Sequence, residues 1–489
     1  MGGRRDPAAI RAGKVGAAFR SRERIWGQPH PRSANPSTLR DGEPGAWDSP
    51  QILSQFLRIP REKGQGDRCV APIGLLSRGA RLAGIDGRMS MVDTEVMFQH
   101  YLGGSSVGPG GRESRREWME RIVGAAMVLP AVSSVPVWAD STSGKSERTR
   151  WSMPGLYPGR VIAVHDSRSI VEGRYQREPV QEMIRRGMME LTGAPDWVAA
   201  WRTFFQPGEV VGIKLNPVSL PYVISAPEVV REIIAGLGAA GIVYKDIVVY
   251  DRYKSQFLEA GFDKWVPEGV RSSWATDYVD NTQQKIAGYD PEHWMDMQLT
   301  LPGYSFENER ARRSYAAQFI TKQVDKLVNL CLLKHHQSAG VTIALKNLSH
   351  GLVNNVSRSH SSAMLNACGA FIPASVSTPV IRNKTVLHIC DAVQGLWHGG
   401  PVMRKEAAKF VWEPKRMYFS TDPVAMDKIG WEELDRKRTA VGMKPLAEAP
   451  MDDFSRFVRM QPEHVDIAGA LGLGVAERSK IDLREIRLA

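Results

Sequence analysis

The stretch from Lys334 to His360 carries the densest set of side chains that could do chemistry. Four histidines lie in it, together with lysines, an arginine and several asparagines. Imidazoles titrate near neutral pH and bind metal ions, whereas ammonium and guanidinium groups bind phosphate and carboxylate groups. We therefore expect a functional site in this stretch, although a structural polar network is the alternative.

Further polar side chains follow other segments that are apolar and rich in β-branched residues, as buried strands of a parallel sheet are. Residues after the carboxyl ends of parallel strands gather at one edge of the sheet, where ligands bind. The side chains that we expect at this edge are Lys214, Asn216, Asp251, Lys334, His336, Thr342, Lys346, Asn347, His350, Asp391 and Asp422.

Two chemistries fit this set. The first is an anion site for phosphate or carboxylate, formed if the cationic side chains converge. Its members would be Lys214, Lys334, Lys346 and Arg358. The second is a divalent metal site of imidazoles and carboxylates. It would combine His336, His350 or His360 with Asp251, Asp391 or Asp422, although no H-E-x-x-H spacing marks the ligands.

Roles follow from these chemistries. We expect catalytic roles, as acid–base groups or metal ligands, for His336, Asp251 and Asp391. The expected ligand-binding side chains are Lys214, Asn216, Lys334, Thr342, Lys346, Asn347, His350 and Asp422. The sequence specifies no cofactor beyond a candidate divalent metal ion.

The elements that must position these residues alternate between strand and helix. Strands are predicted at 160–166, 209–217, 246–252, 326–334, 385–393 and 480–486. Helices are predicted at 178–193 and 225–241, the second capped by Ser225, and 416–434 reads as a short strand running into a helix. This alternation predicts an α/β fold in which a mostly parallel sheet is flanked by helices in a single large domain.

The segment 114–140, "SRREWMERIVGAAMVLPAVSSVPVWAD", is typical of an export signal. Two arginines precede an apolar run that is too short, and too broken by Gly and Pro, for a stable membrane-spanning helix. We predict a twin-arginine signal peptide over 97–139, cleaved near Ala139, and hence the translocation machinery as partner and an extracytoplasmic, periplasmic location. Residues 140–159 are a predicted linker, and 160–489 the working domain.

Residues 1–96 are rich in Pro, Gly, Ser and Arg and have no sustained hydrophobic period. Such a segment buries too little apolar surface to offset chain entropy, which predicts a disordered extension. Because a signal peptide normally opens a chain, the extension is alternatively non-native, with translation starting at Met89, Met91 or Met97.

Charge and cysteine usage narrow the class of protein. The net charge is +11, but the excess is concentrated before residue 140, and no basic stripe interleaved with aromatic residues marks the rest. We therefore do not expect nucleic-acid binding. The four cysteines form no C-x-x-C pair, so neither an iron–sulfur cluster nor a disulfide framework is expected.

The segments "VGIKLNP", "DIVVYDR", "LLKHHQSAGVTIALKNLSHGLVNN", "HICDAVQGLWHGGP" and "FSTDPVAMDKIG" resemble, in order, the DUF362 family, a domain of unknown function. The resemblance covers roughly 161–488. It is most specific in the K-x-H…G-x-T…K-N stretch from Lys334 to Asn347. Some members carry ferredoxin-like iron–sulfur modules, whose cysteine run is absent from this sequence.

Three function classes remain open. The leading expectation is an exported protein with a polar pocket at the strand ends that takes an anionic small molecule, and metal-assisted enzymatic turnover of that molecule is one reading of it. A non-catalytic binding protein of the cell envelope would use the same strand-end pocket without turning its ligand over. An electron-transfer accessory protein is the third, and the missing cluster cysteines weaken it.

Overall fold

The computed structural model describes residues 147–362, 364–401, 405–457 and 460–489. The predicted extension at 1–96 and the predicted signal peptide at 97–139 lie outside these residues. The description below therefore concerns the chain from residue 147 onward.

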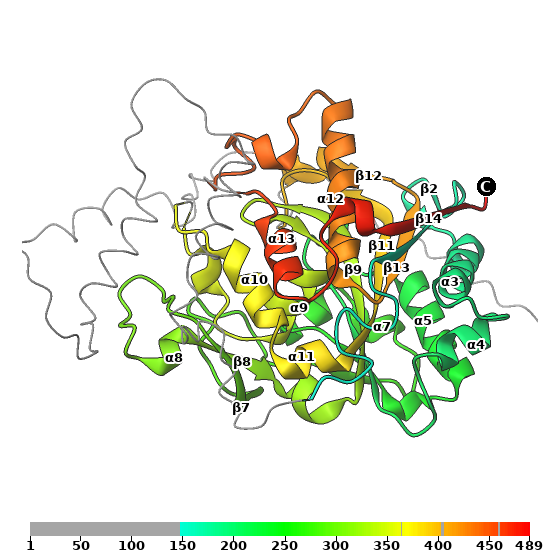
Figure 1. Cartoon of the computed structure of the whole chain (residues 1–489), viewed down its shortest axis with the longest axis horizontal. Helices are drawn as coiled ribbons and strands as arrows, with labels where there is room; N and C mark the ends of the chain where they lie inside the picture. The colour runs from blue at the N-terminus through cyan, green and yellow to red at the C-terminus, as the bar shows by residue number, and fades with distance from the viewer. Residues whose placement is uncertain (1–146, 363, 402–404, 458–459) are drawn as a thin grey trace, which may run out of the picture. The chain divides into compact units, whose positions relative to one another are not determined.

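One large mixed sheet is the centre of the described fold (Figure 1). Its strand order is β14-β1-β13-β11-β9-β4-β5-β6, with β10 beside β9 and β12 beside β11. The strands of this sheet are β1 (Arg160–His165), β4 (Val211–Lys214), β5 (Ile247–Tyr250), β6 (Arg271–Ser273), β9 (Lys326–His336), β10 (Gly340–Thr342), β11 (Thr385–Leu396), β12 (Val411–Trp412), β13 (Arg416–Ser420) and β14 (Asp482–Arg487). Two small hairpins lie outside it, β2 (Ile170–Val171) with β3 (Arg174–Tyr175) and β7 (Tyr289–Asp296) with β8 (Arg313–Ala317).

The sheet is mostly parallel, as predicted. Along the main path, β14 with β1, β11 with β9, β9 with β4, β4 with β5 and β5 with β6 all pair in parallel. Strand β13 is antiparallel to both of its neighbours, and the short strands β10 and β12 pair antiparallel as well. The predicted α/β fold class is therefore confirmed.

Helices follow most of the strands. The α-helices are α3 (Arg177–Thr192), α4 (Trp197–Arg202), α5 (Pro227–Ala240), α6 (Lys254–Glu259), α7 (Phe262–Trp265), α8 (Glu309–Arg312), α9 (Ala344–Leu352), α10 (Cys368–Val376), α11 (Pro379–Lys384), α12 (Pro423–Ala440) and α13 (Glu463–Ala470). Short 3₁₀ turns are η2 (Tyr244–Asp246), η4 (Ser357–His360), η5 (Lys405–Phe410), η6 (Leu446–Glu448) and η7 (Arg478–Lys480), and η3 (Phe319–Gln323) is a π-helical turn.

Local signals at the helix ends explain most of these bounds. Helix α3 ends at Gly193, whose φ of 70° is the left-handed conformation that glycine adopts without strain. Helix α12 is capped by Asp422, whose carboxylate accepts hydrogen bonds from the backbone N–H groups of Val424 and Ala425. The predicted Ser225 cap of α5 is wrong, because Ala226 occupies that position and the Ser225 hydroxyl accepts instead from the backbone N–H of Asn216.

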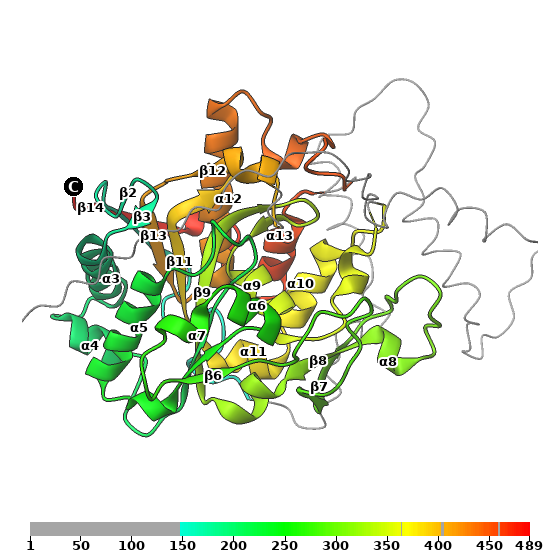
Figure 2. The same cartoon turned by 180° about the vertical axis from the view of Figure 1, so that it is seen from behind.

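Helices cover both faces of the sheet (Figures 1 and 2). One face packs on α3, α4 and α5 through strand residues such as Ile213, Val249 and Leu330. The opposite face packs on α9, α10, α12 and α13 through alternating residues such as Val248, Leu327 and Cys331. Burial on both faces explains why the strands read as continuous apolar runs.

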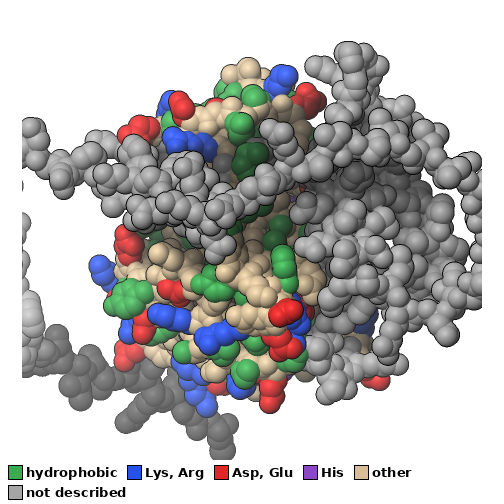
Figure 3. Space-filling model, turned by 90° about the vertical axis from the view of Figure 1, so that its left-hand side faces the viewer, with side chains coloured by type: hydrophobic (Ala, Val, Ile, Leu, Met, Phe, Trp, Pro, Cys, Tyr) green, Lys and Arg blue, Asp and Glu red, His purple; other side chains and the backbone are tan. Residues whose placement is uncertain are grey.

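The exterior of the described residues carries charges of both signs. On the face drawn in Figure 3, Lys and Arg side chains lie among Asp and Glu side chains. None of the described helices is both long enough and apolar enough to cross a membrane.

Helices α4 and α5 approach closely at Gly236. A Cβ atom at this position would lie 2.1 Å from the indole ring of Trp201, which is fully buried in the same core. Gly238, two residues further along α5, has only the ring of Tyr244 at 4.0 Å from such an atom. The two glycines therefore share one helix but differ in available space.

We expect Gly236→Ala to lower the free energy of unfolding by about 1–3 kcal/mol, because the added methyl group overpacks the α4–α5 contact. Gly238→Ala is the matched control and should be neutral or stabilising by up to about 1 kcal/mol, as alanine is in an open helix position. Urea unfolding of the two variants measures both changes. Equal effects would contradict the close contact.

Candidate functional site

The carboxyl ends of three neighbouring parallel strands form the edge at which the predicted residues gather. Strand β9 lies between β11 and β4, and β4 is followed in space by β5. After β4 the chain continues to β5, on one side of the β4–β9 pair. After β9 it continues to β11, on the other side of that pair. In sheets with such a change of direction, ligands bind at the carboxyl ends of the two strands between which it occurs, here β4 and β9.

Lys214 and Asp251 form a buried ion pair at this edge. The Lys214 ammonium lies 2.5 Å from Asp251 Oδ1, and the two side chains are only 3% and 5% exposed. The same ammonium also donates to the backbone carbonyl of Leu215. Gly351 of α9 leaves room for it, because a Cβ atom there would lie 2.1 Å from Lys214 Cε. Both charged groups are thus committed to each other.

Lys334, Asn216 and Asn347 form a second internal network. The Lys334 ammonium donates to Asn216 Oδ1 at 2.9 Å and to the backbone carbonyl of Val218. The Asn216 amide donates to Asn347 Oδ1 at 3.0 Å, and the Asn347 amide donates to Asn329 Oδ1 at 2.7 Å. These predicted ligand-binding side chains therefore form hydrogen bonds with one another. They tie the loop after β4 to α9.

Lys346, on the first turn of α9, differs from the other two lysines. Its side chain is nearly buried, yet among the described residues nothing forms a hydrogen bond or ion pair with its ammonium. Burial lowers its pKa to about 8, with Cys368 opposing and the Arg252 guanidinium adding to the shift. The pKa of Lys334 is also lowered, first by burial and then by the charge of Lys346.

The charge of Lys346 acts on four buried or partly buried imidazoles. Burial is the main cause that lowers the pKa of each, and in each case Lys346 is the second cause. These side chains are His336, His350, His360 and His464. They are therefore neutral near pH 7, and Lys346 carries the charge of the group.

The tautomer of His336 follows from its backbone contacts. Its Nδ1 atom lies 3.1 Å and 3.2 Å from the backbone N–H groups of Ser338 and Ala339, which can only donate. Nδ1 must therefore accept, and the proton of the neutral ring is on Nε2. The ring lies 5.8 Å from that of His360. The other ring nitrogen of His336 is thus an N–H donor, and the lone pair on Nδ1 is not free to act as a base.

Cys368 completes the cluster. His350, His360 and Cys368 offer ligand atoms that all lie within 4.8 Å of one another. The Ser359 hydroxyl lies among them, 3.1 Å from His350 Nε2 and 2.9 Å from His360 Nδ1. We call His336, Lys346, His350, His360 and Cys368 the lysine–histidine cluster.

Two predicted carboxylates lie elsewhere. Asp391 is on the sheet face that packs on α3 and α5, where the Tyr175 hydroxyl lies 3.1 Å from both its oxygens and the backbone N–H of Val393 donates to it. Asp422 accepts from the first turn of α12 and from the backbone N–H groups of Gly159 and Val475. The structure does not show the predicted pairing of either carboxylate with the imidazoles, because Asp391 holds the Tyr175 hydroxyl and Asp422 holds the backbone of Gly159 and Val475.

Arg358 and Thr342 also differ from expectation. The Arg358 guanidinium donates to the backbone carbonyls of Met297 and Leu299 and to the Ser314 hydroxyl, so it holds the β7–β8 hairpin rather than an anion. The Thr342 hydroxyl is buried, and no described residue forms a hydrogen bond with it. Its position gives it no contact that would define a role.

Sequence reasoning missed Cys368 and Asp427 as site residues. Cys368 belongs to no C-x-x-C pair, and no spacing along the chain links it to the histidines. Asp427 accepts hydrogen bonds from the backbone N–H groups of Ala344 and Leu345 at 2.7 Å and 3.1 Å. Since these open α9, the helix that carries Lys346 and His350 is anchored to α12. The regular S-T-D-P-V-A-x-D segment was the available signal for Asp427.

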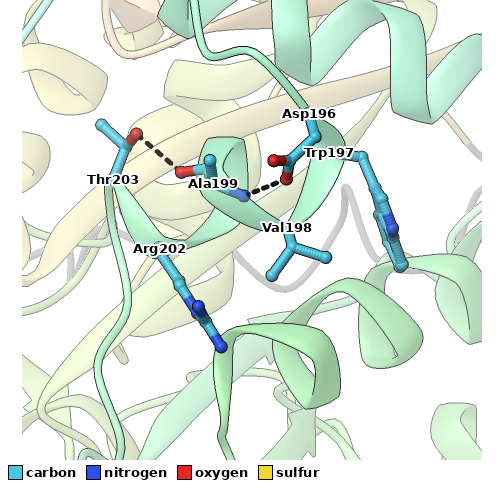
Figure 4. Close-up of a pocket in the computed structure, with 6 residues that line it drawn as sticks. All are labelled: Asp196, Trp197, Val198, Ala199, Arg202 and Thr203. Atoms are coloured by element: carbon cyan, nitrogen blue, oxygen red, sulfur yellow. Dashed lines mark hydrogen bonds between the residues drawn. The ribbon is translucent and has the colours of Figure 1, made fainter.

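A shallow pocket on α4 lies apart from this cluster (Figure 4). It is lined by Asp196, Trp197, Val198, Ala199, Arg202 and Thr203. Its polar groups serve the helix itself, because Asp196 accepts from the backbone N–H of Ala199 and the Thr203 hydroxyl donates to the carbonyl of Ala199. It offers no convergent set of groups for a ligand.

The fold and the cluster together define an α/β protein with buried cationic and imidazole groups at its strand ends. Residues 211–432 match the family described as "Domain of unknown function (DUF362)", which supports the resemblance seen in the sequence. This range includes every residue of the lysine–histidine cluster. No curated protein matches the chain.

One solved structure similar to the chain is that of a Thermotoga maritima protein, a target of the Northeast Structural Genomics Consortium. The sequence identity is 11% and the TM-score 0.29, and the likeness covers 46% of this chain and 52% of that one. The chain thus spans about half the length of that protein.

Asp391 generates a prediction on pH. Burial raises its pKa to about 7, well above that of an unfolded aspartate, so the folded state holds a proton that the unfolded state loses above about pH 4. Folding stability should therefore fall as pH rises from about 4 to 7, by on the order of a few kcal/mol from this group.

We expect Asp391→Asn to remove this contribution. The difference in unfolding free energy, variant minus wild type, should increase from pH 5 to pH 8, because only the wild type loses stability over this range. Urea unfolding of both proteins at pH 5 and at pH 8 measures it. The exposed Asp277→Asn is the control and should show no such change. A pH-independent difference between Asp391→Asn and the wild type would show that the carboxyl ionises normally.

Proposed function

We propose that this chain is an exported protein that binds an anionic small molecule, carrying a phosphate or carboxylate group, at the lysine–histidine cluster. Lys346 would contact the anion, and His336 would donate a hydrogen bond to it. The observation that carries the proposal is the ammonium of Lys346, which is nearly buried and has no hydrogen-bond or ion-pair partner among the described residues.

The surroundings of Lys346 support an anion rather than a cationic or neutral ligand. A buried charge is costly unless it is paired, and an anion would supply the missing counter-charge. The nearby carboxylate Asp251 is already paired with Lys214. The Arg252 guanidinium, which is also close, is held by Tyr289, Gln283 and the carbonyl of His350. Lys346 is thus left as the available cation.

The His336 tautomer favours binding over base catalysis by this residue. Its Nδ1 lone pair accepts from two backbone N–H groups, so the free ring edge is a donor. Donors that converge with an ammonium group are the usual means of holding an oxyanion. We therefore revise the sequence-based role of His336 from an acid–base group to an anion ligand.

Turnover of the ligand separates the enzyme from the non-catalytic binding protein. An enzyme would change the anionic molecule, whereas a binding protein of the cell envelope would release it unchanged. Mass spectrometry of phosphorylated and carboxylated metabolites after incubation with the full chain separates them. A new product that disappears in Lys346→Met would favour the enzyme.

Anion binding is tested with Lys346→Met, which keeps the length of the side chain and removes its charge. Inorganic phosphate, pyrophosphate and citrate are the probes, added to metal-free protein. A ligand at 100 times its Kd should stabilise the wild type by about 2.7 kcal/mol, and Lys346→Met should lose this gain. Thermal unfolding with and without each probe measures it.

Lys384→Met is the matched control. The pKa of Lys384 is also lowered by burial, but its ammonium donates to the backbone carbonyls of Thr321 and Val324, before β9 begins. This variant should keep the full response to the probes. The proposal fails if no probe stabilises the wild type, or if Lys346→Met responds as strongly.

Export is tested on the protein as native cells make it. If the twin-arginine signal acts, the mature N-terminus should lie near residue 140, because the small residues Val137 and Ala139 precede the bond. Sequencing of that N-terminus, and replacement of Arg115 and Arg116 by Lys, measure cleavage and translocation. A peptide from residues 1–88 in native cells would contradict a start at Met89 or later.

A further inference from the structure

The histidine–histidine–cysteine part of the cluster has the composition of a transition-metal site. His350 lies in the last turn of α9, His360 ends η4, and Cys368 begins α10. Their ligand atoms lie within 4.8 Å of one another, and the Cys368 side chain is buried and in the thiol form. We propose that these three residues bind one Zn²⁺ ion, or a metal ion of similar softness, and leave a fourth coordination position open.

The donor set selects the class of metal. Two imidazole nitrogens and one sulfur suit Zn²⁺ and other borderline or soft ions, whereas Mg²⁺ and Ca²⁺ require oxygen ligands. The predicted carboxylate ligands are not available, because Asp251 pairs with Lys214 and Asp422 caps α12. Three protein ligands with one open position are typical of catalytic zinc sites.

The Ser359 hydroxyl shows that the three ligand atoms face one place. It donates its proton to the carbonyl of Val356 at 2.7 Å. The same oxygen lies 3.1 Å from His350 Nε2, 2.9 Å from His360 Nδ1 and 3.8 Å from Cys368 Sγ. Cys368 Sγ also lies 3.5 Å from the Ser338 hydroxyl. The two nitrogens and the sulfur therefore converge on one side chain, as the ligands of a single metal ion would.

The distances require only a small adjustment. With bonds of about 2.0–2.3 Å, the ligand atoms of a tetrahedral site lie roughly 3.3–3.8 Å apart. The present atoms would thus close in by about 1 Å, within the reach of small side-chain rotations. On binding, the Cys368 thiol releases its proton to solvent and the two imidazoles bind through unprotonated nitrogens, so the site exchanges one proton for one metal ion.

The inference goes beyond the proposed function and does not depend on it. The metal ligands are distinct from Lys346 and His336, the two groups assigned to the anion. The two sites are nonetheless neighbours, since the His336 and His360 rings lie 5.8 Å apart. An anion held by Lys346 would therefore lie close to the open coordination position.

Cobalt(II) binding to the full chain tests the metal site. All proteins carry Cys69→Ser, so that only the described cysteines contribute, and the buffer contains no phosphate or carboxylate. We expect one Co²⁺ ion per chain with a thiolate-to-cobalt charge-transfer band, displaced by Zn²⁺. Cys368→Ser should lose the band, and His350→Gln and His360→Gln should each weaken binding more than about 100-fold, beyond the usual effect of an outer-shell change.

Cys390→Ser and His293→Gln are the controls. Cys390 is buried in the sheet core and His293 lies on the β7 hairpin, so both should bind cobalt as the parent does. Absence of the band in the parent, or its persistence in Cys368→Ser, overturns the inference. If Cys368→Ser does not fold, unchanged cobalt affinity in both histidine variants overturns it equally. Lys346→Met should keep the cobalt band, so failure of the anion site and failure of the metal site are separate results.

Discussion

The burial of cationic side chains at the carboxyl ends of parallel strands is the constraint on which this site depends. Lys214, Lys334 and Lys346 all lie there, and a buried ammonium is tolerated only when it is paired or hydrogen-bonded. Asp251 pairs with Lys214, and Asn216 with a backbone carbonyl satisfies Lys334. The third lysine has no such protein partner among the described residues. The same constraint thus accounts for the rigid part of the site and for its available group.

Helix α9 is held in place by contacts at the same strand ends. Asp427 accepts from the backbone of the first turn of α9, and Asn347 of α9 accepts from Asn216 in the loop after β4. The Lys214 side chain packs against Gly351 of α9, where a Cβ atom would clash with it. Each contact joins segments far apart in the sequence. Lys346 and His350 therefore project from a fixed helix, which is the arrangement that a binding or catalytic group requires.

The proposed anion site and the proposed metal site use different residues of the lysine–histidine cluster. Lys346 and His336 offer a charge and an N–H donor, which suit an oxyanion. His350, His360 and Cys368 offer lone pairs on nitrogen and sulfur, which suit a metal ion. A cluster that joins both kinds of group can hold an anion and a metal ion side by side, as hydrolytic and transfer reactions often need.

The order of strands and helices could be predicted from the sequence, because apolar runs and terminal Gly, Pro and Asp residues are local signals. The region of the site could also be predicted, since polar residues after parallel strands meet at one edge. The hydrogen-bond and ion-pair partners of the buried lysines could not be predicted from the sequence. The sequence treats Lys214, Lys334 and Lys346 alike, and only the fold decides which two are already satisfied.

The sequence by itself therefore determined the α/β class and the stretch from Lys334 to His360, which holds the lysine and the three histidines of the cluster. Only the tertiary structure decided that Asp391 turns to the opposite face of the sheet and that Cys368 joins the histidines. Successive side chains of a strand point to opposite faces of the sheet, so a shift of one residue decides the face on which Asp391 lies. The packing of α10 against the rest of the fold, and not its position in the chain, brings Cys368 at its start to the histidines.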